Sequence, residues 1–226
     1  MSEGATGVRM GTSARAAGKP IGLLGGTFDP VHNGHLRVAI EAFEALDLDH
    51  VRVLPLNQPG HRDGPQATVA QRLAMLAACV RPPLVLDRRE IDRGGVSYTV
   101  DTLSELRHEW PGRALCLLLG RDAFSSLPRW HRASELLQLA HIVVAARPLS
   151  GVATDPALDE LIANAHADRV DQLHDQPAGR VFFLELPLLP IASSELRARR
   201  RGGRDVRHLV PDRVDHYITE HQLYRT

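Results

Sequence analysis

The sequence lacks the features that would indicate a membrane, an export route or a nucleic-acid partner. No apolar run approaches the ~20 residues that a membrane-spanning helix requires. The first nineteen residues are rich in Gly, Ala, Ser and Arg, without the apolar centre of a secretory signal. Twenty-seven basic residues balance twenty-seven acidic ones, so the net charge of zero provides no overall attraction to nucleic acid or anionic lipid. We therefore expect a cytoplasmic protein with no nucleic-acid and no membrane partner.

Cysteine is equally scarce. Cys79 and Cys116 lie inside apolar runs without the spacing of metal ligands, so we expect two buried free thiols. No other grouping of His, Cys and Asp has the spacing of a dedicated metal site. At 226 residues and 43% hydrophobic content, the chain is long enough for one α/β domain with a full core. We interpret residues 1–19 as a disordered leader and residues 20–226 as a single domain with a C-terminal helical segment.

Short apolar runs alternate with amphipathic stretches from Ile21 onward. The runs are apolar on both faces, as in parallel strands covered by helices on each side, and predict strands at Ile21–Gly25, Val51–Pro55, Leu84–Asp87, Leu115–Gly120, His141–Ala146 and Val181–Leu186. Helices are predicted at His35–Leu48, Thr68–Val80, Val100–Trp110, Ser134–Leu139 and Pro156–Ala167, and from Ser193 and Pro211 onward. This order predicts an α/β fold with a Rossmann-like, doubly wound parallel sheet and helices on both faces. Gly151–Gly179 is polar and weakly patterned, which indicates an insertion or a mobile loop.

The strongest functional signal is GGTFDPVHNGHL, residues 25–36, between the first strand and the first helix. Gly25 and Gly26 allow a tight turn and a close approach of the backbone to an anion. The helix that follows presents free N–H groups and the positive end of its dipole. His32 and His35 flank a glycine, so both imidazoles can converge on one phosphate. The combination favours an anion site over a merely structural turn.

A His-x-Gly-His motif after a GGxFDP turn resembles the nucleotidyltransferase superfamily with HxGH sites. The resemblance implies ATP as the donor, Mg²⁺ carried by that ATP, and release of pyrophosphate. It implies that His32 and His35 are catalytic residues that contact the ATP phosphates. It also implies an ATP-binding loop that contains Gly25, Gly26, Thr27 and Phe28.

A second motif, IASSELR, occupies residues 191–197. Its two hydroxyls at a predicted helix start provide cap oxygens, and the arginine one turn later can reach the same anion. Taken alone, the motif is an ordinary capped helix. It is similar to the ISSTxIR motif of the same superfamily, which implies that Ser193, Ser194 and a catalytic Arg197 hold the β- and γ-phosphates.

Three further segments concern the acceptor. PLNQPGHR, residues 55–62, follows the second strand at the edge where ligands bind to open α/β sheets, although a surface loop explains it equally well. SYT, residues 97–99, opens a helix that Thr99 or Ser97 would cap, and its N–H groups suit a carboxylate. Asp122 follows the fourth strand, where it suits ribose hydroxyls. Trp130 suits stacking on an aromatic ring, although a lone Trp is more often a core residue.

In this order, from Gly25 to Arg197, the segments resemble one branch of the superfamily, the nicotinate-nucleotide adenylyltransferases. The resemblance implies that Gly120 and Asp122 contact the ribose side of ATP. It implies an acceptor site for nicotinate mononucleotide that is formed by Asn57, His61, Arg62, Tyr98, Thr99, Trp130, His131 and Arg147.

The implied reaction transfers AMP from ATP to nicotinate mononucleotide and forms deamido-NAD and pyrophosphate in NAD biosynthesis. The acceptor phosphate is ionised at neutral pH, so catalysis requires positioning and electrostatic stabilisation rather than a general base. Two alternatives stay open: an HxGH adenylyltransferase for phosphopantetheine or nicotinamide mononucleotide, and a non-catalytic ATP-binding regulator. The sequence also leaves open whether the chain forms a homo-oligomer.

Overall fold

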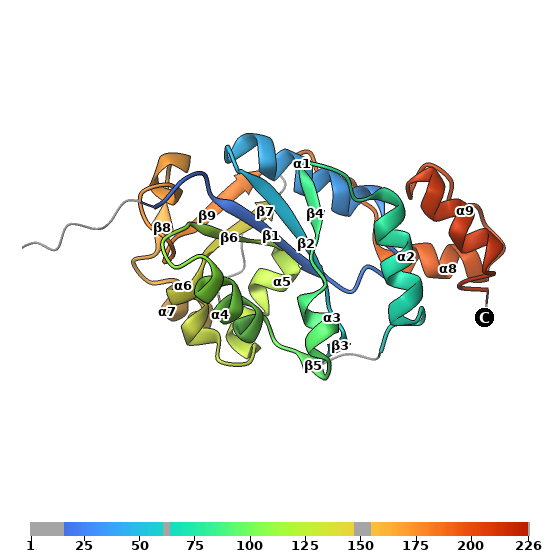
Figure 1. The fold of residues 1–226 in the computed structure, drawn as a ribbon, viewed down its shortest axis with the longest axis horizontal. Coiled ribbons are helices and arrows are strands. Elements are labelled where there is room, and N and C mark those ends of the chain that lie inside the picture. The colour runs from blue at the N-terminus through green and yellow to red at the C-terminus, as the bar shows by residue number, and fades with distance from the viewer. Residues whose placement is uncertain (1–15, 61–63, 147–154, 226) are drawn as a thin grey trace, which may run out of the picture.

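A seven-stranded sheet forms the middle layer of the structure (Figure 1). The computed structural model describes residues 16–60, 64–146 and 155–225. Neighbouring strands of this sheet run parallel, in the order β4-β2-β1-β6-β7-β9-β8. Helices cover both faces, so the predicted Rossmann-like, doubly wound fold is confirmed.

The strands of the main sheet lie close to the predicted runs. They are β1 (Ile21–Gly26), β2 (His50–Pro55), β4 (Leu84–Leu86), β6 (Leu115–Gly120), β7 (His141–Ala146), β9 (Val181–Glu185) and the unpredicted β8 (His166–Ala167). A separate two-stranded parallel sheet pairs β3 (Gln58–Pro59) with β5 (Val96–Ser97). Strands of two residues leave no periodic pattern in a sequence, which explains why β3, β5 and β8 were not predicted.

The helices follow the strands in the expected alternation. The α-helices are α1 (Asn33–Ala45), α2 (Val69–Cys79), α3 (Arg89–Arg93), α4 (Thr99–Glu109), α5 (Arg121–Ser125), α6 (Leu136–Leu139), α7 (Pro156–Ile162), α8 (Ser193–Arg201) and α9 (Asp212–Glu220). Short 3-10 turns are η1 (Leu127–Arg129), η2 (Ala133–Glu135) and η3 (Val170–Leu173). No helix in the described part of the chain is long and apolar enough to cross a membrane.

The region after residue 154 corrects two predictions. The helix expected over Pro156–Ala167 ends at Ile162, because Asn164 adopts a left-handed conformation (φ 64°) and the chain then pairs with β9 as β8. The part of Gly151–Gly179 that the structure describes is not a mobile loop. It forms α7, β8 and η3, and Leu158 and Leu173 are buried.

Two hydrophobic clusters hold the layers together, one on each face of the sheet. Successive residues of β6 alternate between them: Leu115, Leu117 and Leu119 pack with α4–α7, while Cys116 and Leu118 pack with α1, α2, α8 and α9. This double burial is why parallel strands are apolar throughout. Cys116 is buried and Cys79 half-buried, and both are free thiols, as predicted.

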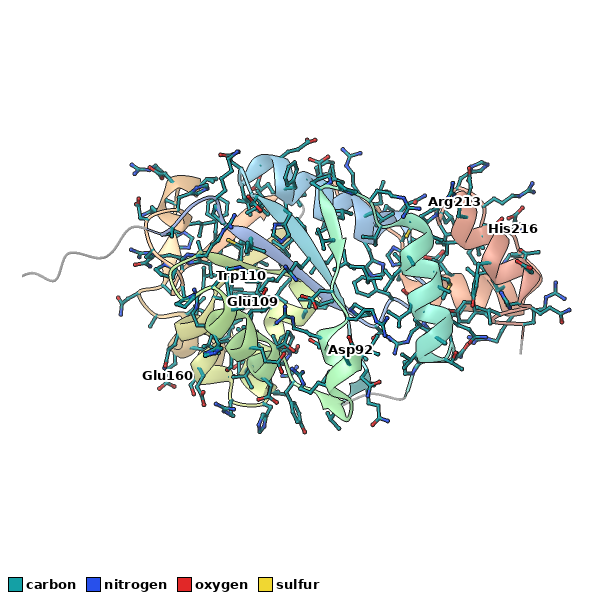
Figure 2. All side chains as sticks on the ribbon, in the orientation of Figure 1. Asp92, Glu109, Trp110, Glu160, Arg213 and His216 are labelled. Carbon is teal, nitrogen blue, oxygen red and sulfur yellow. The ribbon has the colours of Figure 1, made fainter. Side chains whose placement is uncertain are left out.

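Helix α9 covers the end of the hydrophobic cluster that also contains residues of α1, α2 and α8. Val214 and Ile218 are buried on its inner face, where it packs against α2. Arg213 and His216 point outward from the same helix (Figure 2). The helix therefore brings the segment that follows it close to the start of α2.

The expected leader overlaps the described residues at positions 16–19. The Ala17 N–H donates to the Gly112 carbonyl, and Arg113 Nε donates to the Lys19 carbonyl. These contacts attach the chain to the loop after α4 before β1 begins. Residues 1–15 lie outside the described residues.

His141 is a fully buried histidine at the start of β7. Its Nε2 lies 2.8 Å from the Gln176 carbonyl, and its Nδ1 accepts the Arg180 N–H at 3.0 Å. The carbonyl requires a donor, so the neutral ring carries its proton on Nε2. Burial lowers the pKa of His141 to about 4.

We predict that this histidine makes the fold sensitive to acid. The folded-state pKa lies below the unfolded value of about 6.5, so the unfolded chain binds more protons and stability falls as the pH drops from about 6.5 to 4, by about 3 kcal/mol in total. The unfolding free energy of His141→Asn should fall less steeply over this window in urea titrations. His216→Asn, at an exposed site, should match the wild-type slope. Equal slopes for His141→Asn and wild type would contradict the prediction.

Candidate active site

The loop after β1 lies where the strand order of the sheet reverses. β1 pairs with β2 on one side and with β6 on the other. β4 lies beyond β2, and β7, β9 and β8 lie beyond β6. Open α/β sheets bind ligands outside the carboxyl ends of the strands at such a switch point. Gly26 ends β1 and Gly120 ends β6, so the two glycine-containing ends meet at this edge.

His32 and His35 form the start of α1 with their own side chains. His32 is the N-cap residue, and its Nδ1 accepts the His35 N–H at 3.3 Å, while His35 Nδ1 accepts the His32 N–H at 3.3 Å. The rings are stacked, with centroids 3.6 Å apart. This reciprocal capping box starts the helix at Asn33, two residues before the predicted start. A Cβ on Gly34 would come 3.0 Å from His32 Nδ1, which explains the glycine between the histidines.

The capping box also sets the protonation of both imidazoles. Each Nδ1 accepts a backbone N–H, so each neutral ring carries its proton on Nε2. Burial lowers the pKa of His32 to about 4. Burial, and then the charge of a protonated His32, lower the pKa of His35 well below its usual value. At neutral pH the pair thus offers two uncharged Nε2–H donors.

Helix α8 attaches to the same loop. Arg197 Nη1 donates to the Asp29 carbonyl at 2.7 Å, and Ser193 Oγ donates to the Pro30 carbonyl at 2.9 Å. The expected capping by Ser193 or Ser194 is wrong, because Ala192 is the N-cap residue and, within the described residues, no side chain caps this helix. Ser193 instead satisfies a loop carbonyl, and Ser194 is exposed. The two sequence motifs nevertheless meet at one loop.

Asp29 anchors this loop, although sequence analysis gave it no role. Its buried carboxylate accepts the Gln66 N–H at 2.8 Å, the Ala67 N–H at 3.1 Å and the Tyr224 hydroxyl at 2.7 Å. Arg197 Nη1 lies 3.8 Å from Asp29 Oδ2. The loop is therefore held by three segments that are distant in the sequence.

Thr27 and Phe28 support the loop rather than project from it. The Thr27 carbonyl accepts Arg72 Nη1 at 2.9 Å. Phe28 has a left-handed backbone (φ 49°), and its buried ring packs edge-on against His35 with centroids 4.9 Å apart. The buried ring leaves only the backbone of Phe28 for the predicted ATP contact, which stays a prediction. Gly25 is exposed, and a Cβ there would meet no atom within 4 Å.

The small sheet of β3 and β5 places the predicted acceptor loop beside the SYT segment. The Asn57 N–H donates to Ser97 Oγ at 2.9 Å, and Asn57 Nδ2 donates to the Gly95 carbonyl at 2.9 Å. The expected capping of α4 by Thr99 or Ser97 is wrong. Tyr98 is the N-cap residue, and Ser97 instead holds the loop. Thr99 is the first residue of the helix.

The aromatic residues predicted for the acceptor lie around the start of α4 and after α5. The Tyr98 and His131 rings lie 4.3 Å apart. Trp130 Nε1 donates to Ser126 Oγ at 3.0 Å, and its ring packs on the cluster beneath α4–α7, which agrees with the core interpretation. Asp122 is exposed in the first turn of α5 rather than at the strand end itself. His61, Arg62 and Arg147 lie outside the described residues.

Comparison with known proteins agrees with this geometry. The chain matches the cytidylyltransferase-like family over residues 23–199. It is 46% identical over 208 residues to a protein of Aeromonas hydrophila named probable nicotinate-nucleotide adenylyltransferase, covering 91% of this chain and 97% of that one. A relative of the same name from Methylococcus capsulatus is 45% identical, covering 90% and 99%. The chain belongs to the nicotinate-nucleotide adenylyltransferases.

Solved structures of other proteins share this fold. The nicotinic acid mononucleotide adenylyltransferase of Plasmodium falciparum, complexed with NaAD, superposes with a TM-score of 0.71 at 17% identity, covering 92% of this chain and 98% of that one. A putative nicotinate-nucleotide adenylyltransferase from Vibrio parahaemolyticus gives a TM-score of 0.59 at 16% identity, covering 92% and 96%. At such identities these matches establish the adenylyltransferase fold alone.

A second anchor of the candidate site, Arg72, was not predicted from the sequence. Arg72 on α2 is fully buried, and its guanidinium donates to the carbonyls of Thr27, Leu56 and Asn57 at 2.9, 2.8 and 3.2 Å. It therefore joins the loop after β1 to the loop after β2. A signal was present, because Arg72 shares a helix face with Met75, Leu76 and Cys79, and a charge on an apolar face is unusual.

We predict that Ser97 orders the acceptor loop. Ser97→Ala leaves the Asn57 N–H without its acceptor, so the unfolding free energy should fall by about 1 kcal/mol and amide exchange at Asn57 should accelerate. Ser104→Ala is the matched control, because the Ser104 hydroxyl only donates to Val100 within α4. Unchanged exchange at Asn57 in the Ser97→Ala protein would remove this role.

Proposed function

We propose that the protein transfers AMP from ATP to nicotinate mononucleotide, forming deamido-NAD and pyrophosphate. The observation that carries the proposal is the stacked His32–His35 pair, whose two Nε2–H donors belong to a loop that Arg197 also contacts. Relatives at 43–47% identity that bear the name of this activity support it. The neighbouring structures complexed with NaAD and APC support a nucleotide ligand.

The reaction is an in-line displacement at the α-phosphorus. An ionised phosphate oxygen of the acceptor forms the new P–O bond as the bond to the bridging oxygen of pyrophosphate breaks, and no proton has to be removed first. His32, His35 and Arg197 supply donors for the charge that accumulates on the departing pyrophosphate. The start of α1 adds N–H groups and the positive end of the helix dipole.

The acceptor is proposed to bind between the β2 loop and the start of α4. Within the described residues no side chain caps α4, so the N–H groups of its first turn suit the nicotinate carboxylate. Tyr98 and His131 provide ring faces for the pyridine. The roles of His61, Arg62 and Arg147 stay predictions.

Mg²⁺ is proposed to arrive with ATP, bound mainly by phosphate oxygens, where it would neutralise charge on the triphosphate. No group of three or more His, Cys, Asp or Glu side chains in the described residues is arranged to hold a metal. The Asp29 carboxylate is already occupied by three donors. A metal ion that arrives bound to the substrate fits this donor set.

Cytoplasmic location and a homo-oligomer also stay predictions.

A coupled pyrophosphate assay tests the function directly. With ATP, nicotinate mononucleotide should release pyrophosphate faster than nicotinamide mononucleotide or phosphopantetheine, and chelation by EDTA should stop turnover until Mg²⁺ is restored. Preference for either other acceptor would reassign the substrate. ATP binding without pyrophosphate from any acceptor would leave the regulator alternative.

We predict that two His35 variants separate the roles of its two ring nitrogens. In His35→Asn, Oδ1 can replace Nδ1 as the acceptor of the His32 N–H but nothing replaces the Nε2–H, so kcat should fall ~10²–10³-fold at near-normal stability. In His35→Gln, the amide oxygen can accept the His32 N–H, as Gln71 accepts the Thr68 N–H at the same position of α2. The longer side chain also carries an N–H toward the Nε2 position, so more turnover should remain than in His35→Asn, at a near-normal unfolding free energy. Near-normal turnover of His35→Asn would exclude His35 from the chemistry.

A further inference from the structure

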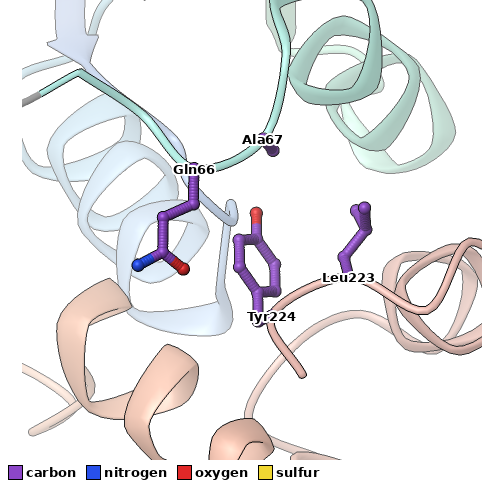
Figure 3. Close-up of a pocket in the computed structure, with 4 residues that line it drawn as sticks. All are labelled: Gln66, Ala67, Leu223 and Tyr224. Atoms are coloured by element: carbon purple, nitrogen blue, oxygen red, sulfur yellow. The ribbon is translucent and has the colours of Figure 1, made fainter. Parts of the chain in front are cut away.

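Tyr224 links the segment after α9 to the loop after β1. Its hydroxyl donates to Asp29 Oδ1 at 2.7 Å, across 195 positions of sequence. The ring is 6% exposed and borders a cavity of about 340 Å³ with Gln66, Ala67 and Leu223 (Figure 3). The hydroxyl points away from its own backbone, toward the Gln66–Ala67 segment. Because one side of the ring borders a cavity, the hydrogen bond helps to fix its position.

Asp29 stands between this tyrosine and Arg197. Arg197 Nη1 donates to the Asp29 carbonyl at 2.7 Å but lies 3.8 Å from Oδ2. The carboxylate oxygens are instead bound by Tyr224 and by the backbone N–H groups of Gln66 and Ala67. Arg197 is therefore oriented by the loop without a close ion pair to the carboxylate.

We propose that Tyr224 is a positioning residue for ATP, because its hydroxyl holds the Asp29 carboxylate 3.8 Å from Arg197 Nη1, beyond hydrogen-bond distance, and leaves that guanidinium available to phosphate. The inference rests on the proposed function, in which Arg197 binds the triphosphate. A charge-assisted hydrogen bond between guanidinium and carboxylate is about twice as strong as a neutral one. A carboxylate that closed the 3.8 Å gap would compete with ATP for Arg197.

The groups around the Asp29 carboxylate would favour its binding to Arg197 if the Tyr224 hydroxyl were removed. Without the hydroxyl, Oδ1 would keep only the Ala67 N–H at 3.1 Å and lose its shorter hydrogen bond in a buried site, which favours rotation toward the nearest positive charge. Two guanidiniums face the group, those of Arg72 and Arg197. Arg72 Nη1 and Nη2 already donate to three carbonyls, whereas Arg197 Nη1 donates to one, that of Asp29 itself, and lies 3.8 Å from Oδ2. Arg197 is therefore the guanidinium that a turned carboxylate would meet. Burial and the neighbouring Asp29 raise the pKa of Tyr224, so the hydroxyl stays a donor at neutral pH.

The test is Tyr224→Phe, which removes one oxygen and keeps the ring. The KM for ATP should rise about tenfold, which is the scale of one hydrogen bond to a charged group. The KM for nicotinate mononucleotide should stay within about twofold, because the Tyr224 hydroxyl bonds to Asp29 and not to the part of the acceptor loop that the structure describes, residues 55–60. Tyr217→Phe is the matched control. Tyr217 is a half-buried tyrosine of α9 whose ring packs on His221, and this variant should match the wild type in both constants.

A double-mutant cycle with Arg197→Ala shows whether the effect passes through the arginine. If it does, Tyr224→Phe should change ATP binding little in the Arg197→Ala background, measured by calorimetry without turnover. The inference would be overturned by an unchanged KM for ATP, by equal increases in the KM values of both substrates, by additive effects in the cycle, or by a Tyr224→Phe protein that does not fold. A wild-type protein that binds no ATP would instead refute the proposed function.

Discussion

The buried carboxylate of Asp29 is the group on which the arrangement of the site depends. Leaving it without donors would destabilise the fold by several kcal/mol, so the segments that satisfy it must come together. They are the lead-in to α2, through Gln66 and Ala67, and the segment after α9, through Tyr224. The carbonyl of the same residue fixes Arg197. The contacts that satisfy Asp29 in the folded chain are thus also those that bring the residues of the proposed phosphate site together.

In the proposed reaction, the histidines on this loop act as neutral donors because of how α1 begins. Two imidazolium rings 3.6 Å apart would repel each other, and burial disfavours either charge. Their Nδ1 atoms cap the helix, so both Nε2–H groups are oriented before any substrate arrives. Such preorganised dipoles need no reorganisation as negative charge develops. In the proposed reaction, Arg197 supplies the formal positive charge beside these two neutral donors.

The sequence predicted what local patterns encode and missed what depends on tertiary contacts. Apolar runs gave the main strands, because parallel strands are buried on both faces, and the HxGH and SSELR motifs lie at the loop where they were expected to meet. The capping roles were wrong: Ser193 and Ser97 bond to loops, not to their own helices. Asp29 and Arg72 were missed because their partners are backbone groups and, for Asp29, a tyrosine hydroxyl 195 positions away, which no local residue pattern reveals.

Arg72 shows how the two halves of the site constrain each other. A buried guanidinium needs acceptors for its N–H groups. Arg72 Nη1 and Nη2 find them in carbonyls of both loops, Thr27 on one side and Leu56 and Asn57 on the other, while Nε has no hydrogen-bond partner among the described residues. Moving either loop would remove an acceptor from a buried charge. Arg72 therefore keeps the spacing between the loop after β1 and the loop after β2 fixed. The proposed transfer needs a fixed spacing, because in-line attack of one bound substrate on the other tolerates little misalignment.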